Sequence, residues 1–170
     1  MPVLIAFAGP SGAGKSTIAR AVAPHLRAAY LRIDSVEQAL RASGTLPAGV
    51  VAEGYVVAYA VAADQLAIGL SVVADAVNPL GLTRDAWRAV ADRAGVPLID
   101  VEVVCSDAAE HRRRVETRTI DVPGLVPPTW EAVRTREYHA WDRPRLVLDT
   151  AARDAGACVR ELLEQLPPGA

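Results

Sequence analysis

The first residues with an evident chemistry are Gly9-Pro10-Ser11-Gly12-Ala13-Gly14-Lys15-Ser16. They match the pattern Gly-x-x-x-x-Gly-Lys-Ser/Thr, in which backbone N–H groups and a lysine bind the phosphates of a nucleoside triphosphate. In that geometry Lys15 contacts the β and γ oxygens, and Ser16 is a ligand of Mg²⁺. We therefore expect ATP and Mg²⁺ as cofactors. The nucleotide contacts are expected from Gly9, Ser11, Gly12, Ala13, Gly14, Lys15, Ser16 and Thr17.

Two aspartates come directly after short apolar runs, and both are candidates for the reaction centre. Asp34 follows residues 29–33, and Asp75 follows residues 72–74. Because the carboxyl ends of parallel strands meet at a ligand crevice, both carboxylates are expected near the nucleotide. Asp34 would orient or deprotonate an attacking hydroxyl, unless it only caps a helix. Asp75 would hold Mg²⁺ through water or bind the phosphoryl acceptor.

A strongly basic segment at residues 108–118 supplies further candidates. Arg114 and Arg118 are four residues apart, so a helix here would carry both on one face. A proline-rich loop follows, and the two together predict a lid over about residues 108–128. Its arginines would supply positive charge to the transition state of phosphoryl transfer. The alternative is a solvated basic face that pairs with neighbouring glutamates.

Apolar runs and helical periodicity alternate along the chain, which predicts the elements that must position these residues. Strands are expected at residues 3–8, 29–33, 71–74, 98–105 and 146–148. Helices are expected at residues 15–28, 36–42 (capped by Ser35), 50–70 (bent near Gly54), 83–94, 108–118, 130–140 (capped by Thr129) and 151–166. Strands that alternate with helices indicate a three-layer α/β fold with a five-stranded parallel sheet covered on both faces.

Length and composition limit the remaining possibilities. A chain of 170 residues that is 51% hydrophobic fits one domain, residues 1–170. Its 18 basic and 20 acidic residues give a net charge of −2, which does not favour a nucleic-acid partner. The apolar amino-terminal stretch stops at Gly9, too short for a membrane span, so a cytoplasmic protein is expected. Cys105 and Cys158 have no metal-ligand spacing and are expected to be free thiols.

The motifs together resemble those of the zeta-toxin-like and polynucleotide-kinase-like group of P-loop kinases, which includes chloramphenicol phosphotransferase. The likeness rests on the glycine-rich loop, on Ile33-Asp34-Ser35, and on residues 72–79 continuing to Arg84 and Trp87. It spans roughly residues 3–118. One aspartate stands after the second strand where polynucleotide kinases have two.

This resemblance implies several further expectations. The strand order would be 2-3-1-4-5, and ATP would be the phosphoryl donor. Asp34 would be the catalytic base, and Arg114 and Arg118 would be lid arginines. Arg114 would also contact the nucleotide, and Thr150 would lie near the adenine.

The leading hypothesis is an ATP-dependent kinase that phosphorylates a hydroxyl of a small molecule, such as a metabolite, a sugar, a nucleoside-like compound or an antibiotic. A polynucleotide 5′-hydroxyl kinase and an ATPase or nucleotide-sensing regulator are the alternatives. A guanine-nucleotide switch is excluded, because its Asn-Lys-x-Asp element cannot be built from Asn78 and Lys15, the only asparagine and lysine. Neither the acceptor nor the oligomeric state follows from the sequence.

Overall fold

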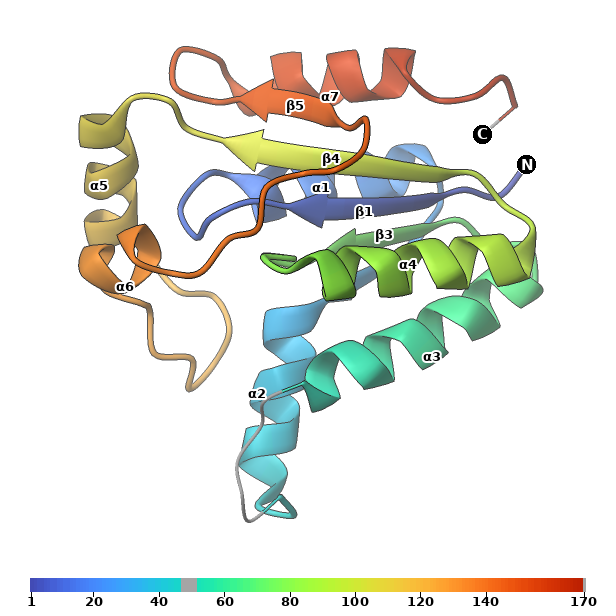
Figure 1. Cartoon of the computed structure of the whole chain (residues 1–170), viewed down its shortest axis with the longest axis horizontal. Coiled ribbons are helices and arrows are strands. Elements are labelled where there is room, and N and C mark those ends of the chain that lie inside the picture. Colours follow the sequence, from blue (N-terminus) through green and yellow to red (C-terminus); the bar gives the residue numbers. More distant parts are fainter. Residues whose placement is uncertain (47–51, 170) are drawn as a thin grey trace.

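The computed structural model describes residues 1–46 and 52–169. In this part of the chain five parallel strands form one sheet in the order β2-β3-β1-β4-β5 (Figure 1). The strands are β1 (Leu4–Ala8), β2 (Ala29–Arg32), β3 (Val72–Asp75), β4 (Leu98–Val104) and β5 (Leu146–Asp149). The predicted fold class and strand order are confirmed.

Helices cover both faces of the sheet, and two further helices stand at the carboxyl ends of the strands (Figure 1). The helices are α1 (Lys15–His25), α2 (Ile33–Ser43), α3 (Glu53–Ala67), α4 (Gly81–Ala94), α5 (Ala108–Thr117), α6 (Trp130–Arg134) and α7 (Ala155–Glu164). One apolar cluster joins α1 and α7 to the sheet, and a second joins α3 and α4 to it. The carboxyl-end helices, α5 and α6, lie beside the loop between β1 and α1.

Strand β1 lies in the middle of both apolar clusters and is buried throughout. Ile5 and Phe7 point toward α1 and α7, whereas Leu4 and Ala6 point toward α3 and α4. This alternation follows from the two-residue period of a strand, and burial on both faces explains the continuous apolar run. The rigid central strand delivers the glycine-rich loop at the carboxyl edge of the sheet.

The predicted starts of α2 and α7 need correction. Helix α2 begins at Ile33, with Arg32 as its N-cap, so Ser35 is not the cap and Asp34 lies in the first turn. A carboxylate in the first turn is favourable beside the helix dipole, which compensates for the missing side-chain cap. Helix α7 begins at Ala155 rather than residue 151, because Asp154 caps it by accepting a hydrogen bond from the Ala157 N–H.

Helices α1, α3 and α6 are shorter than predicted, and α1 ends at His25 instead of residue 28. Residues 50 and 51 lie outside the described residues, and α3 begins at Glu53, so Gly54 occupies its first turn instead of a bend. Thr129 caps α6 as predicted, but α6 ends at Arg134 instead of residue 140. The segment that follows is held in another conformation, since the carbonyls of residues 139 and 140 accept hydrogen bonds from Arg84.

Candidate functional site

The loop at residues 9–16, called the P-loop below, joins β1 to α1 and needs its glycines for steric reasons. Gly12 has a φ of 85°, and a Cβ there would lie 2.6 Å from Val115 Cγ2 of α5. Gly9 has a φ of 125°, and a Cβ there would collide with the Val103 carbonyl of β4. Glycine therefore lets the loop turn tightly against its neighbours and present backbone N–H groups at the start of α1, where an anion is favoured.

Lys15 is buried in the first turn of α1, and its side chain folds back over the P-loop. Its Nζ donates a hydrogen bond of 2.8 Å to the Pro10 carbonyl. Burial lowers the pKa of Lys15 to about 8, although the Asp75 and Asp34 carboxylates oppose that shift. No ion pair of Lys15 occurs among the described residues. The ammonium is thus a desolvated cation that a phosphate would stabilise.

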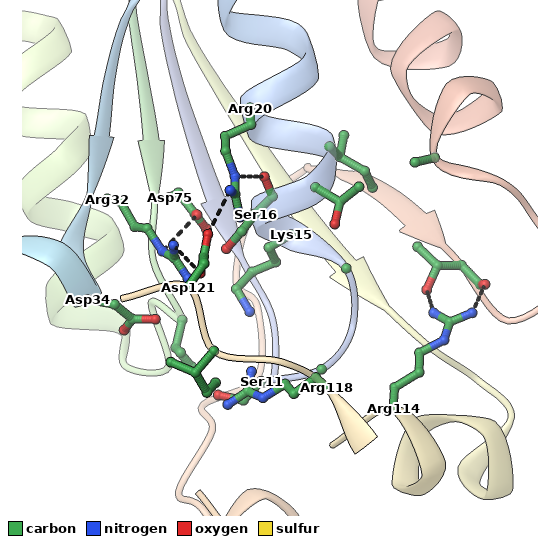
Figure 2. Close-up of a pocket in the computed structure, with 18 of the residues that line it drawn as sticks. Ser11, Lys15, Ser16, Arg20, Arg32, Asp34, Asp75, Arg114, Arg118 and Asp121 are labelled. Carbon is green, nitrogen blue, oxygen red and sulfur yellow. Dashed lines mark hydrogen bonds and ion pairs between the residues drawn. The ribbon is translucent and has the colours of Figure 1, made fainter. Parts of the chain in front are cut away.

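Lys15 lies in the middle of a cavity of about 460 Å³ at the carboxyl edge of the sheet (Figure 2). Its lining includes six cationic side chains, Lys15, Arg20, Arg32, Arg114, Arg118 and Arg153. It includes three carboxylates, Asp34, Asp75 and Asp121. The excess of cations contrasts with the net negative charge of the whole chain, so the cavity is suited to a polyanion.

Arg114 and Thr150 form one side of this cavity. Arg114 donates to both the hydroxyl and the carbonyl of Thr150, at 2.8 and 2.9 Å, and to Glu110 at 2.7 Å. The Thr150 hydroxyl donates in turn to the carbonyl of Ala13 in the P-loop, at 2.8 Å. Arg114 therefore fastens α5 to the P-loop at the β5 side of the site, apart from Asp34 (Figure 2).

Arg118 lies one helical turn after Arg114, as the spacing predicted. It is the C-cap of α5, and its N–H donates to the Arg114 carbonyl at 3.0 Å. Its side chain lines the cavity, and its buried Nε has no hydrogen-bond partner among the described residues. Burial lowers the pKa of Arg118, and the Asp34 carboxylate opposes the shift. A buried donor without a protein partner is rare, so this Nε can donate to a molecule bound in the cavity.

The two candidate aspartates lie on the other side of the cavity. Asp34 is half-buried, and its carboxylate makes no hydrogen bond or ion pair within residues 1–46 and 52–169. Asp75 is buried and accepts a hydrogen bond of 2.7 Å from the Tyr30 hydroxyl. The free Asp34 carboxylate can accept a proton or a hydrogen bond from a bound molecule. Asp75 is held more firmly and serves as a fixed negative charge.

The predicted magnesium ligands, Ser16 and Asp75, line the same cavity (Figure 2). A hydroxyl and a carboxylate are hard oxygen donors, which suit Mg²⁺. No group of three His, Cys, Asp or Glu residues able to hold a metal occurs in the described part of the chain. Such a site fits an ion that completes its coordination with phosphate oxygens and water.

Three further cavity residues were missed by sequence reasoning. Asp121, which follows α5, accepts ion pairs from Arg20 at 2.7 Å and from Arg32 at 2.8 Å. Arg20 lies on α1, and Arg32 ends β2 opposite Asp75 of β3. Arg32 could have been found by the same strand-end argument that selected Asp34 and Asp75. No pattern in the sequence around Asp121 predicts its contacts with the two arginines.

The motif at residues 72–79, which continues to Arg84 and Trp87, contains mainly structural residues. Asn78 ties the end of β3 to β1, since its Nδ2 donates to the Phe7 carbonyl at 2.6 Å. Its Oδ1 accepts from the Trp87 indole at 3.1 Å. Arg84 is buried and donates to four backbone carbonyls. Of this motif, Asp75 faces the cavity, while Asn78, Arg84 and Trp87 hold the edge of the sheet in place.

Comparison with known proteins gives a family and a fold. The model of the AAA domain family matches residues 4–127. No curated protein matches the sequence significantly. In the described residues, no helix has the length and apolar character needed to cross a membrane.

Solved structures with the same fold include several kinases. The Mycobacterium tuberculosis APS kinase CysC, in complex with AMPPNP and APS, is 25% identical, with a TM-score of 0.70 and 96% of each chain covered. A putative kinase from Chloroflexus aurantiacus is 22% identical, with a TM-score of 0.73, over 98% of this chain and 99% of that one. A gluconokinase from Sinorhizobium meliloti is 22% identical, with a TM-score of 0.67, over 96% and 90%. The chain has the fold of P-loop kinases.

Proposed function

Because the chain belongs to the AAA domain family and has a P-loop kinase fold, we propose that it is an ATP-dependent kinase for a hydroxyl of a small molecule. One observation carries the proposal. A single cavity contains both the P-loop Lys15 and, on its other side, the unpaired carboxylate of Asp34. An enzyme that joins a nucleoside triphosphate to a hydroxyl needs these two groups within reach of the same phosphorus atom.

The P-loop side of the cavity would hold the nucleotide. Lys15 would exchange the Pro10 carbonyl for phosphate oxygens, and the N–H groups at the start of α1 would bind the β-phosphate. Thr150 and the guanidinium of Arg114 would form the wall beside the adenine. Arg114 would therefore bind the nucleotide, as expected from the resemblance. It would not contact the transferred phosphoryl group, so we do not propose a catalytic role for it.

The Asp34 side would hold the acceptor. Its carboxylate would orient the acceptor hydroxyl and take its proton as the oxygen bonds to the γ-phosphorus. The bond between that phosphorus and the β–γ bridging oxygen breaks, and ADP leaves with the electron pair. Lys15 and Arg118 would stabilise the charge on the transferring group, for which the unpartnered Nε of Arg118 supplies a donor.

Ser16 and Asp75 would hold the magnesium ion, which would supply positive charge to the phosphates when it is bound. Tyr30 fixes the Asp75 carboxylate by its 2.7 Å hydrogen bond. We further propose that residues 1–170 form one kinase domain, with a lid over about residues 108–128. Membership in the narrower zeta-toxin-like and polynucleotide-kinase-like group stays a prediction, supported by Asp34 and Asp75.

An ATP-consumption screen tests the function. Purified protein is incubated with MgATP and single hydroxyl-bearing metabolites, sugars, nucleosides, aminoglycosides or phenicols, and products are identified by mass. We expect one chemical class to gain a phosphoryl group in equimolar amount to the ADP formed. The Lys15→Ala protein is the inactive control, because the lysine supplies charge to the site rather than core packing.

Two outcomes of this screen would contradict the proposal. ATP consumption that is independent of every acceptor would make the protein an ATPase or a nucleotide-sensing regulator. An active Lys15→Ala protein would remove the P-loop from the chemistry altogether.

A further inference from the structure

We propose that the acceptor is a small molecule that carries an anionic group, and that Asp121 occupies the place of this group in the free protein. The inference rests on the proposed function and specifies its acceptor. It starts from the ion pairs of Asp121, whose two carboxylate oxygens are each bound by a different arginine. Arg20 and Arg32 come from separate elements, α1 and β2, and converge on this one carboxylate (Figure 2).

Arg32 is the better placed of the two arginines to bind a ligand. Its side chain is only 14% exposed, and it lies between two carboxylates. Its Nη1 binds Asp121 at 2.8 Å, while its Nε is 4.0 Å from Asp75 and has no hydrogen-bond partner in the described residues. A guanidinium can bind a carboxylate, phosphate or sulfate through two parallel N–H groups, and the Nε of Arg32 is available for such a contact.

Asp121 is the more easily displaced partner in this contact. Its side chain is 43% exposed, and Arg20 is 49% exposed, so the ion pair that joins them is screened by solvent. Asp121 follows the segment 118–120, which also lines the cavity. Movement of this short segment would release Arg20 and Arg32 together, whereas both arginines stay anchored to α1 and β2.

The location of this arginine pair separates it from the nucleotide. Arg32 neighbours Asp75 across β2 and β3, and the charges of both Asp34 and Arg32 act on Arg118. The arginine pair therefore lies on the Asp34 side of Lys15, opposite the wall of Arg114 (Figure 2). An anion bound there would belong to the acceptor, and it would hold the acceptor hydroxyl beside Asp34.

Sulfate binding in the presence of saturating Mg-AMPPNP provides the first test. The nucleotide analogue fills the P-loop, so calorimetry with inorganic sulfate reports the remaining anion site. We compare wild type, Asp121→Asn, the double variant Asp121→Asn/Arg32→Ala, and Asp92→Asn. Asp92 is exposed on α4, and its substitution makes the same change in net charge.

Asp121→Asn should bind sulfate about tenfold more tightly than wild type, because two charge-assisted contacts no longer compete with the probe. Asp92→Asn should match wild type, and the double variant should lose the gain. Equal affinity in all four proteins overturns the proposal, as does a gain that survives Arg32→Ala. Binding of Mg-AMPPNP itself is measured in the same series and reports separately on the proposed function.

Acceptor pairs that differ in charge provide the second test. The kinase assay compares D-gluconate with D-glucitol, glycerol 2-phosphate with glycerol, and adenosine 5′-monophosphate with adenosine. Turnover should be confined to anionic members, and Arg32→Ala should raise their KM by at least about tenfold with kcat less affected. Arg32→Lys should restore part of this loss. Preferred turnover of neutral members, or of a short single-stranded DNA with a free 5′-hydroxyl, overturns the assignment to small anions.

Discussion

Replacing Lys15 with methionine should stabilise the nucleotide-free protein, although it removes a central functional group. Lys15 is buried, and its pKa of about 8 lies well below the usual 10.5. Since each tenfold change in proton affinity is worth about 1.4 kcal/mol, the charged lysine costs the fold about 3 kcal/mol at neutral pH. Methionine has a similar length and no charge. The lost hydrogen bond to Pro10 offsets about 1 kcal/mol of the gain.

The expected net gain for Lys15→Met is therefore about 2 kcal/mol at pH 7, or a rise of about 4–8 °C in Tm for a chain of this size. Urea unfolding without nucleotide measures it. Arg93→Met is the matched control, because Arg93 is exposed on α4 and loses the same charge. The control should change stability by no more than about 0.5 kcal/mol.

The pH dependence gives the sign of the effect. Between pH 8 and 10.5 the unfolded chain keeps the Lys15 proton that the folded protein has lost. Stability rises with pH wherever the unfolded state binds more protons. The stability of wild type therefore rises relative to that of Lys15→Met across this interval. The advantage of the variant is complete below pH 8 and shrinks as the pH rises through this interval. Near pH 10.5 wild type is the more stable protein by about 1 kcal/mol, because only the lost hydrogen bond to Pro10 remains. A variant less stable than wild type at pH 7, or a difference independent of pH, would refute the reasoning.

Three further substitutions probe the site. Asp34→Asn should slow phosphoryl transfer to the acceptor by roughly 10² to 10⁴, with little change in MgATP affinity, as measured by steady-state kinetics. Full activity of this variant would show that Asp34 only stabilises the first turn of α2. Arg118→Ala should lower kcat by a factor about 10³ larger than the factor by which it weakens MgATP binding. The control Arg112→Ala, on the exposed face of α5, should leave kcat unchanged. If the two variants have the same kcat, Arg118 has only a structural role. Gly12→Ala should cost about 2–4 kcal/mol in urea unfolding, because strain at φ 85° adds to a clash with α5. Gly44 has a φ of 66° and no neighbouring atoms where a Cβ would lie, so Gly44→Ala should lower the free energy of unfolding by only about 1 kcal/mol. Equal losses in the two variants would show that the protein relieves the clash between residue 12 and α5.

The elements that depend on local patterns could be predicted from the sequence. The P-loop lies between an apolar run and a periodic helix. The strand order 2-3-1-4-5 was implied by the family resemblance, not by any local pattern, and it is confirmed. Asp34 and Asp75 could be placed at one edge of the sheet because parallel strands all end there. Helix starts were harder. Ser35 was the better cap by residue type, but the close of β2 at Arg32 starts α2 three residues earlier than predicted.

The contacts between distant segments could not be predicted. The spacing placed Arg114 and Arg118 one turn apart, and both line the cavity, but it did not reveal the partner of Arg114. Arg114 donates to Thr150, which is 36 residues away in sequence. Asp121 meets Arg20 and Arg32 through tertiary packing alone, which no periodicity reports. The sequence thus predicted that the P-loop, Asp34 and Asp75 come together, and missed the charged cluster of Arg20, Arg32 and Asp121 in the same cavity.

Binding of MgATP at the P-loop is the property on which every other functional assignment depends. Thermal or urea unfolding of wild type and Lys15→Met, each with and without MgATP, measures it directly. We predict that MgATP at a hundredfold excess over its Kd stabilises wild type by ~2.7 kcal/mol and leaves Lys15→Met nearly unchanged. If neither MgATP nor MgGTP stabilises wild type, or if both proteins respond equally to MgATP, residues 9–16 do not form the site of a kinase.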